Sequence, residues 1–208
     1  MLKRMNGYGR VLLFFLLLSF AVPVHAGEPA NQVKQTVDKV LDILRNKELK
    51  RPDRTKDRRA ALRKVIAERF DFEEMAKRSL ALHWAKRTAE EKKEFVSLYS
   101  DLLERTYINK IEDYSDEKIL YTGESTDEEY ATVKTKIITK KNMEVPIDYR
   151  LLRKDGKWAV YDVVIEGVSL VNNYRTQFNA ILRSGGYEEL IRRMEKKQVS
   201  EATEKAKQ

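Results

Sequence analysis

The sequence predicts an α+β fold in which a helical N-terminal half and closing helices pack on a four-stranded antiparallel sheet. This prediction depends on two changes in the spacing of apolar residues along the chain. Apolar residues recur at helical spacing as far as residue 111, alternate with polar residues from residue 119 to residue 165, and return to helical spacing after Ser169. Because helices and strands fall into separate blocks, the strands are expected to pair with one another as antiparallel neighbours.

Four helices are expected before the sheet. Apolar residues between Val33 and Leu44 predict a first helix over residues 31–45, and the run from Leu62 to Ile66 marks a second. Two capping boxes predict a short third helix through residue 79 and a long fourth helix: Asp71 with Glu74, and Thr88 with Glu91. The apolar stripe of the fourth helix consists of Phe95, Leu98, Tyr99, Leu102, Leu103, Tyr107 and Ile111.

Four strands are expected over residues 119–122, 131–137, 143–151 and 158–165. Asp155-Gly156 fits a tight hairpin turn, which needs positive φ angles, between the last two strands. The fourth strand is apolar on both faces, and this predicts an interior position in the sheet. Pro146 has no amide donor, so it predicts a bulge or a sheet edge in the third strand.

A helix is expected to begin after Ser169, whose hydroxyl suits an N-cap. The turn at Ser169 also resembles the nucleophile elbow of serine hydrolases, but the second glycine of that motif is missing and His83 would have to act alone. The N-cap is therefore the favoured interpretation. Gly185-Gly186 predicts a left-handed cap at the end of this helix, and a last helix is expected up to Met194.

The first 26 residues have the order of a cleavable secretory signal peptide. Three basic residues precede a 12-residue apolar run, which ends at Val24-His25-Ala26. As a helix this run would rise about 18 Å, which is too short for a hydrocarbon core of about 30 Å. Cleavage after Ala26 is expected to leave one domain over residues 27–196 and a polar tail over residues 197–208.

The charge pattern and the composition exclude several kinds of site. The basic run from Lys47 to Lys64 is interrupted by Glu48, Asp53 and Asp57, so a solvated helical face is favoured over a phosphate-binding stripe. There is no cysteine, and His83 is the only histidine after cleavage, so neither a disulfide framework nor a metal site is expected. The secretory signal and the interleaved acids argue against nucleic-acid binding. No glycine-rich phosphate loop precedes a helix, so no nucleotide site is expected. No catalytic residues and no cofactor are predicted.

The chain contains the run Val-Tyr-Asp-Val-Val-Ile-Glu-Gly-Val-Ser-Leu over residues 160–170 and Asn-Tyr-Arg-Thr-Gln-Phe over residues 173–178. With Phe-Asp-Phe-Glu-Glu-Met-Ala at residues 70–76, Trp84 and the stretch 95–107, these runs resemble the MlaC family of periplasmic phospholipid-shuttling proteins. The resemblance covers residues 33–194. Similar proteins carry Leu-Gly where this chain has Leu80-Ala81, so a tighter or differently bent turn is expected there.

This resemblance implies a strongly curved sheet that is roofed by helices, with an apolar pocket between them. It implies a soluble periplasmic carrier that encloses phospholipid acyl chains, leaves the headgroup near solvent and makes or breaks no bond. Two partners are implied, an outer-membrane lipoprotein complex and an inner-membrane lipid ABC transporter with a ring-shaped lipid-binding subunit. The alternative is a secreted α+β binding module for another apolar ligand such as a hopanoid. The residues expected in the wall of the pocket or core are Trp84, Leu98, Tyr99, Leu102, Val133, Ile137, Val145, Ile147, Tyr149, Trp158, Val160, Val164 and Phe178.

Arg175 lies among apolar neighbours on the helix after Ser169, at a position where the resembled family also has an arginine. Its stem is expected to pack while its guanidinium reaches a fixed acceptor. A carboxylate such as Asp162 or Glu166 is the favoured acceptor, and a lipid phosphate or an acidic partner surface are the alternatives. Asp162 shares a strand face with Val160 and Val164 in a regular strand, so the sequence leaves open which face of this strand looks inward.

Overall fold

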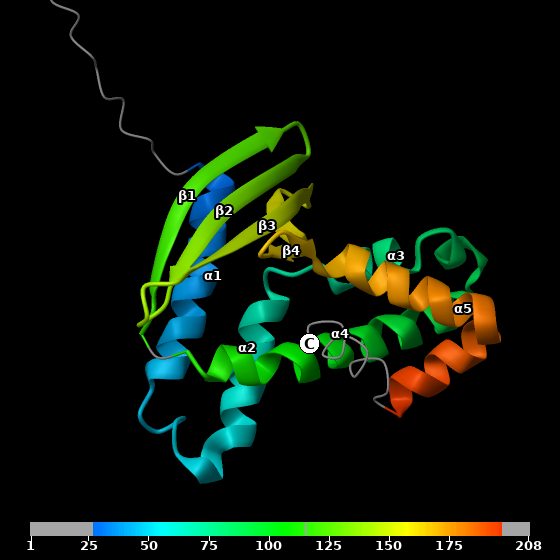
Figure 1. The fold of residues 1–208 in the computed structure, drawn as a ribbon, viewed down its shortest axis with the longest axis horizontal. Helices are drawn as coiled ribbons and strands as arrows, with labels where there is room; N and C mark the ends of the chain where they lie inside the picture. Colours follow the sequence, from blue (N-terminus) through cyan, green and yellow to red (C-terminus); the bar gives the residue numbers. More distant parts are fainter. Residues whose placement is uncertain (1–26, 115, 197–208) are drawn as a thin grey trace, which may run out of the picture.

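The computed structural model describes residues 27–114 and 116–196, in which five α-helices pack against and beside a five-stranded antiparallel sheet (Figure 1). The α+β fold class is confirmed. The sheet has one strand more than predicted, because residues 168–169 pair briefly with the end of the fourth strand before the last helix begins. The expected signal peptide and the expected polar tail lie outside the described residues.

The helices follow the predicted order. α1 begins three residues earlier than expected, after an extended Gly27 and with a proline in its first turn. Both expected N-caps are present: Asp71 accepts a hydrogen bond from the Glu74 amide, and Thr88 and Glu91 form a complete capping box. The helical segments are α1 (Glu28–Arg45), η1 (Pro52–Arg54), α2 (Thr55–Ala67), α3 (Phe72–Leu80), η2 (Ala81–Lys86), α4 (Ala89–Glu112) and α5 (Leu170–Glu195).

Two backbone positions with positive φ shape these helices. Ala81, which follows α3, has φ 50° and ψ −124°, a conformation that costs an L-residue free energy and suits glycine. The turn at Leu80-Ala81 thus has a glycine-type conformation without glycine. Gly186 has φ 77° inside α5, so the predicted left-handed break separates the two helical halves of that segment.

The sheet is a simple meander in the order β1-β2-β3-β4-β5. The turn between β3 and β4 has φ 50° at Asp155 and 75° at Gly156, as the hairpin prediction requires. β4 lies between β3 and the short β5, and its residue Val160 also bridges Phe70, which confirms its interior position. The strands are β1 (Lys118–Asp127), β2 (Tyr130–Ile138), β3 (Glu144–Lys154), β4 (Lys157–Ile165) and β5 (Val168–Ser169).

The prediction of an edge or a bulge at Pro146 is wrong. β3 is an interior strand that pairs with β2 along its length, and Pro146 pairs with Lys136 in regular register. The β3–β4 ladder starts one residue later, at Ile147, while the Pro146 carbonyl accepts a hydrogen bond from the Glu166 amide. An N–H at position 146 would point to the same side as this carbonyl, toward β4 and beyond the end of the β3–β4 ladder. The proline therefore removes no hydrogen bond from either ladder.

The two register shifts in the sheet lie elsewhere. In β1, Thr122 is an extra residue between Tyr121 and Gly123, and in β4, Tyr161 is an extra residue between Val160 and Asp162. A bulge reverses which face the following residues occupy, because side chains alternate with a period of two.

Helices cover the two ends of the sheet differently (Figure 1). α1 packs across β1 and β2, whereas α3, α4 and α5 form a separate helical core beside β4. Phe95, Tyr99, Tyr174 and Phe178 are fully buried in this helical core, with ring centroids 5.5–6.0 Å apart. The helical stripe predicted for residues 95–103 therefore packs mainly on other helices.

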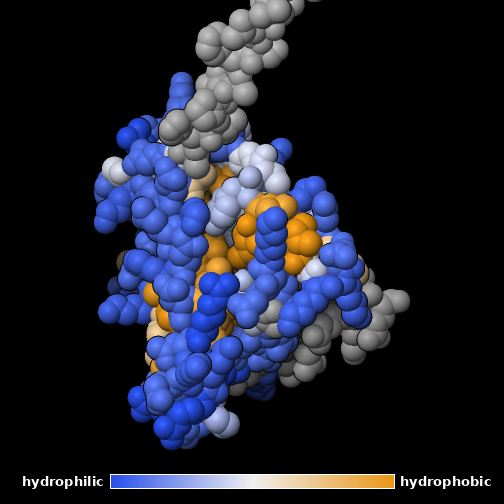
Figure 2. Space-filling model, turned by 90° about the vertical axis from the view of Figure 1, so that its left-hand side faces the viewer, coloured by the Kyte–Doolittle hydropathy of each residue, from blue (hydrophilic) through white to orange (hydrophobic). Residues whose placement is uncertain are grey.

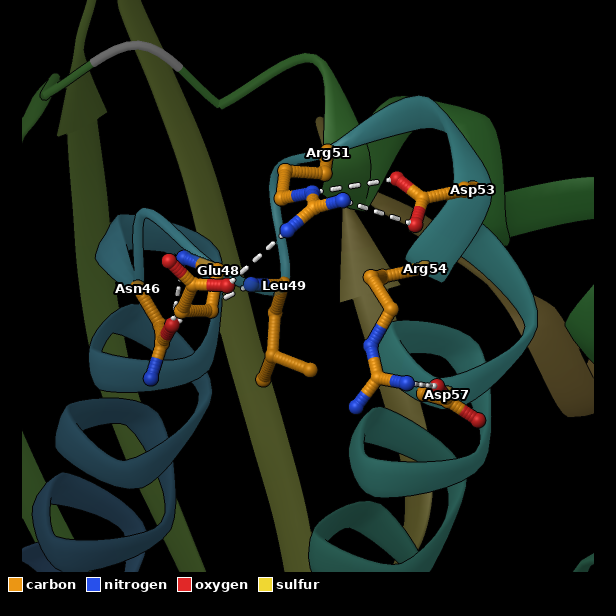
Figure 3. Close-up of polar contacts among 7 residues, drawn as sticks. All are labelled: Asn46, Glu48, Leu49, Arg51, Asp53, Arg54 and Asp57. Atoms are coloured by element: carbon orange, nitrogen blue, oxygen red, sulfur yellow. Dashed lines mark hydrogen bonds and ion pairs between the residues drawn. The ribbon is translucent and has the colours of Figure 1, made fainter.

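The loop between α1 and α2 is held by its own polar groups (Figure 3). The Asn46 side chain accepts hydrogen bonds from two amides, and Arg51 contacts Asp53 through two nitrogens at 3.2 and 3.1 Å. Arg54 pairs with Asp57 at 3.1 Å. Because the arginines of this basic segment pair with carboxylates of the fold, the structure favours a solvated face over a phosphate-binding stripe.

Candidate functional site

An apolar cavity lies between the inner face of the sheet and the helices, and it has two lobes. The α1 lobe, of about 380 Å³, has walls from α1, α4 and strands β1 to β4. The α3 lobe, of about 230 Å³, has walls from α2, α3, α4, β3 and β4. Both have the apolar character of pockets that hold small ligands, and the α1 lobe also falls within their usual size of roughly 300–1,000 Å³, whereas the α3 lobe alone is smaller.

One set of side chains lines both lobes, so the lobes are neighbouring compartments with a common wall. This shared wall comes from α2, α4, the strands β3 and β4, and the segment between α2 and α3. It contains Ile66, Phe70, Tyr107, Ile111, Ile147, Tyr149 and Ile165. Only the two tyrosines among them carry a polar side-chain atom. Burial raises the pKa of Tyr149 to about 12 and raises the pKa of Tyr107 as well, so both hydroxyls stay protonated.

The bulge in β4 decides which residues of this strand reach the cavity. Ile147 and Tyr149 of β3 pair with Ile165 and Val163 of β4, and all four line the cavity. Beyond the extra residue Tyr161, Val160 pairs with Leu151 and lines the α1 lobe. The inner face of β4 therefore carries Val160, Val163 and Ile165, which settles the face that the sequence left open.

Asp162 is 2% exposed on the other face, where it holds the start of α5. It accepts hydrogen bonds from the Ser169 hydroxyl at 2.6 Å and the Val171 amide at 3.0 Å, and it pairs with Arg150 at 3.2 Å. Ser169 in turn accepts a hydrogen bond from the Asn172 amide, so its predicted role as N-cap is confirmed.

The rim of the cavity is polar. At the α3 lobe, Arg63 pairs with Glu104 at 2.6 Å, and both residues line the lobe. At the α1 lobe, the half-buried Arg69 donates to the Thr36 hydroxyl at 3.2 Å and the Trp158 carbonyl at 2.6 Å. Burial lowers the pKa of this guanidinium. Arg69 thus joins α1 to the start of β4 at the cavity wall, a role that the sequence reasoning missed.

Five of the thirteen predicted wall residues line the cavity: Ile137, Val145, Ile147, Tyr149 and Val160. The other eight lie in packed regions. Tyr99, Leu102 and Phe178 are buried in the helical core, with Trp84 and Leu98 packed against them, and Val133 and Trp158 are buried between the sheet and α1. Val164 is buried on the outer side of β4, and lipid contact at all thirteen positions stays a prediction.

The sequence reasoning gave no cavity role to α1 and α2, and on α4 it chose Leu98, Tyr99 and Leu102, which do not line the cavity. α1 contributes Val33, Val37, Val40, Leu41 and Leu44, the same residues that define its helical stripe. On α4, Tyr107 and Ile111 line the cavity, whereas Tyr99 and Leu102, two turns earlier, belong to the helical core. The helical stripes were therefore visible, but the element that each stripe faces was not.

The carboxylate partner predicted for Arg175 is wrong. Its Nε donates to the carbonyl oxygen of Arg78 at 3.0 Å, in the last turn of α3, and the side chain is exposed. Asp162 is occupied by its contacts at the start of α5. Arg175 is therefore held within the fold by a backbone acceptor, in the position of a cation at a helix C-terminus.

Apolar surface is visible on the side of the molecule that lies at the left of Figure 1, where hydrophobic residues gather between hydrophilic ones (Figure 2). None of the helices in the described part of the chain is long and apolar enough to cross a membrane. Within residues 27–114 and 116–196, no three His, Asp or Glu side chains gather in a way that could hold a metal ion.

Comparisons with known proteins agree on one family. The family model described as "MlaC protein" matches residues 34–196. The chain is 25% identical over 193 residues to the intermembrane phospholipid transport system binding protein MlaC of Haemophilus influenzae, covering 88% of this chain and 90% of that protein. It is 26% identical over 180 residues to the toluene tolerance protein ttg2D of Pseudomonas putida, covering 83% of this chain and 82% of that protein.

A solved structure shares the fold. It is that of a phospholipid-binding protein from Ralstonia solanacearum in complex with a phospholipid, with a TM-score of 0.73 and 22% sequence identity. The match covers 85% of this chain and 99% of the other.

Proposed function

The chain belongs to the MlaC family, and from this premise we propose that it is a periplasmic carrier that encloses the acyl chains of a phospholipid in the two-lobed cavity. It carries the lipid between an outer-membrane lipoprotein complex and an inner-membrane ABC transporter with a ring-shaped lipid-binding subunit. The names of its relatives and the phospholipid in the Ralstonia solanacearum structure support this proposal. The observation that carries it is the apolar cavity with its polar rim.

Enclosing the acyl chains in the cavity lowers the main free-energy barrier to moving a lipid through water. Two chains of about 15 methylenes each would cost on the order of 24 kcal/mol in water, at about 0.8 kcal/mol per methylene. A cavity lined by isoleucine, valine and phenylalanine removes most of that cost. Transfer from a bilayer then exchanges one apolar environment for another, so pickup and release can be close to balanced. The carrier itself needs no fuel, and direction comes from its partners.

The division into two lobes favours a lipid with two chains over a rigid polycyclic ligand such as a hopanoid. The shared wall keeps the two compartments apart with large side chains, among them Phe70, Tyr107 and Tyr149. Two flexible chains can enter separate compartments on either side of this wall. A fused ring system would have to displace the wall.

Native mass spectrometry of the mature protein purified from a bacterial periplasm tests this function. We expect a bound mass of a phospholipid with two acyl chains, and a mature chain that starts near Gly27. Protein stripped of lipid should regain it from phospholipid vesicles. A ligand-free protein that takes up no lipid from vesicles contradicts the carrier function, and a bound mass of a polycyclic lipid supports the hopanoid alternative.

A further inference from the structure

The shared wall of the two lobes contains two polar atoms, the hydroxyl oxygens of Tyr107 and Tyr149. The other five members of this wall are four isoleucines and a phenylalanine. Tyr149 comes from the interior strand β3, and Tyr107 from the last third of α4. Two separate elements therefore each bring one hydroxyl to the boundary between two apolar compartments.

Neither hydroxyl has a hydrogen-bond partner among the residues that the structure describes. Two buried tyrosines outside the cavity do have partners: the Tyr99 hydroxyl contacts Ser79 at 3.0 Å, and the Tyr187 hydroxyl donates to the Glu91 carbonyl at 3.0 Å. The Tyr121 hydroxyl, on β1, is buried without a partner among the described residues. Tyr107 and Tyr149 are both half-buried, and neither hydroxyl is among the fully buried, unpartnered side-chain atoms of the described residues, so each keeps accessible surface and is free to donate. Once a ligand fills the cavity and excludes water, a hydroxyl left without an acceptor would cost free energy that phenylalanine avoids with nearly the same shape. Two such hydroxyls at one place in an apolar cavity point to an acceptor that arrives with the ligand.

The chemistry of a two-chain lipid supplies that acceptor, and this step depends on the proposed function. If one chain occupies each lobe, the point where the chains diverge lies beside the shared wall. In an acyl lipid this is where the ester groups are, and each ester carbonyl is a hydrogen-bond acceptor. Two of the cations that line the lobes are already committed, since Arg63 is paired with Glu104 and Arg69 is bound to protein acceptors. The third, Lys110, has its ammonium 5.8 Å from the centroid of the Tyr107 ring.

We propose that the hydroxyls of Tyr149 and Tyr107 donate hydrogen bonds to the ester carbonyls of the bound lipid. They make the carrier selective for ester-linked chains over ether-linked chains of the same length and headgroup. Because each bond contributes about as much as a typical net hydrogen bond, each hydroxyl provides about a 2- to 10-fold preference.

The test is a competition between two lipids that differ only in these carbonyls. Mature protein stripped of lipid is incubated with vesicles that contain equal amounts of a diester phosphatidylcholine and its diether analogue, and the ratio of the two bound lipids is read by native mass spectrometry. Wild type, Tyr149→Phe, Tyr107→Phe and the double variant are compared. Tyr187→Phe is the matched control, because its hydroxyl lies in the helical core outside the cavity.

We expect wild type and Tyr187→Phe to favour the diester lipid, and the ratio to fall towards one in the double variant. The melting temperatures of Tyr149→Phe and Tyr107→Phe should be equal to or above that of wild type, since no bond within the protein is lost. An equal ratio in wild type, or a ratio that neither Tyr→Phe change moves, overturns the inference while leaving lipid carriage intact. Equal loss of both lipids in Tyr149→Phe assigns the tyrosine to packing and also overturns it. A wild type that binds neither lipid removes the proposed function and this inference together.

Discussion

Substituting tryptophan at Ile147 and at Val133 separates the cavity wall from the packed core. Both side chains lie on the inner face of the sheet, on adjacent strands, but Ile147 lines both lobes whereas Val133 is 0% exposed in packed surroundings. An indole at Ile147 can extend into the cavity and occupy space that acyl chain would fill. At Val133 the same indole has no empty volume and must displace its neighbours.

Val133→Trp should therefore lose stability, whereas Ile147→Trp should lose lipid affinity. Overpacking costs about 1–3 kcal/mol, so Val133→Trp should lower the melting temperature by about 3–10 °C in a domain of this size. Ile147→Trp should stay within about 3 °C of wild type. If its indole displaces about three methylenes of bound chain at about 0.8 kcal/mol each, lipid affinity falls by about fiftyfold.

Thermal melting and uptake of a fluorescent phospholipid from vesicles measure both effects on the same samples. Lipid uptake per folded molecule should be nearly normal in Val133→Trp. The reasoning is refuted if Ile147→Trp melts as early as Val133→Trp, because Ile147 would then be part of a solid core. It is equally refuted if Ile147→Trp is stable and takes up lipid as well as wild type.

Three further predictions concern positions outside the cavity. Ala81→Gly should raise the melting temperature by about 2–4 °C, because glycine relieves about 1 kcal/mol of backbone strain at φ 50°. An unchanged or lower melting temperature in thermal melts would contradict this. Arg175→Ala removes a hydrogen bond to a carbonyl in the last turn of α3, so calorimetry should show a small loss of stability. Uptake of phosphate-bearing lipids and of neutral lipids should both be unchanged. A selective loss of phosphate-bearing lipid would instead show that Arg175 binds the headgroup. Burial alone would raise the pKa of Glu112, but hydrogen bonds from Arg59 and Arg58 lower it below its usual range. Its stabilising effect is therefore present above about pH 4.3 and lost as the pH falls through the lowered pKa, so the melting-temperature gap between wild type and Glu112→Gln should narrow below about pH 4.

Local signals in the sequence predicted the elements well. The caps at Asp71 and Thr88, the turn at Asp155-Gly156 and the break at Gly186 each depend on a few neighbouring residues, and the structure has all of them. The pocket wall depends on which element faces which, and a stripe does not carry that information. Tyr99 and Tyr107 belong to one stripe of α4, yet the first packs on α5 and the second lines the cavity.

The two bulges explain why alternation alone could not assign the faces of the sheet. In a regular β4, Asp162 would follow Val160 onto the inner face and bring a carboxylate into the apolar cavity. The extra residue Tyr161 turns Asp162 outward, where it accepts a hydrogen bond from the Val171 amide in the first turn of α5, and brings Val163 inward in its place.

The bulge in β1 has the complementary effect. With Thr122 as the extra residue, Glu124 pairs with Val133 on the inner face, and its carboxylate accepts a hydrogen bond from the Ala30 amide at 2.7 Å. Both irregularities thus place a carboxylate at the N-terminus of a helix, where unpaired amides and the helix dipole favour negative charge. The shift in β4 keeps a carboxylate out of the cavity, and the shifts in β4 and β1 each supply a carboxylate that anchors a helix, α5 and α1 respectively. The lining of the cavity and the attachment of these two helices therefore depend on single extra residues in two strands.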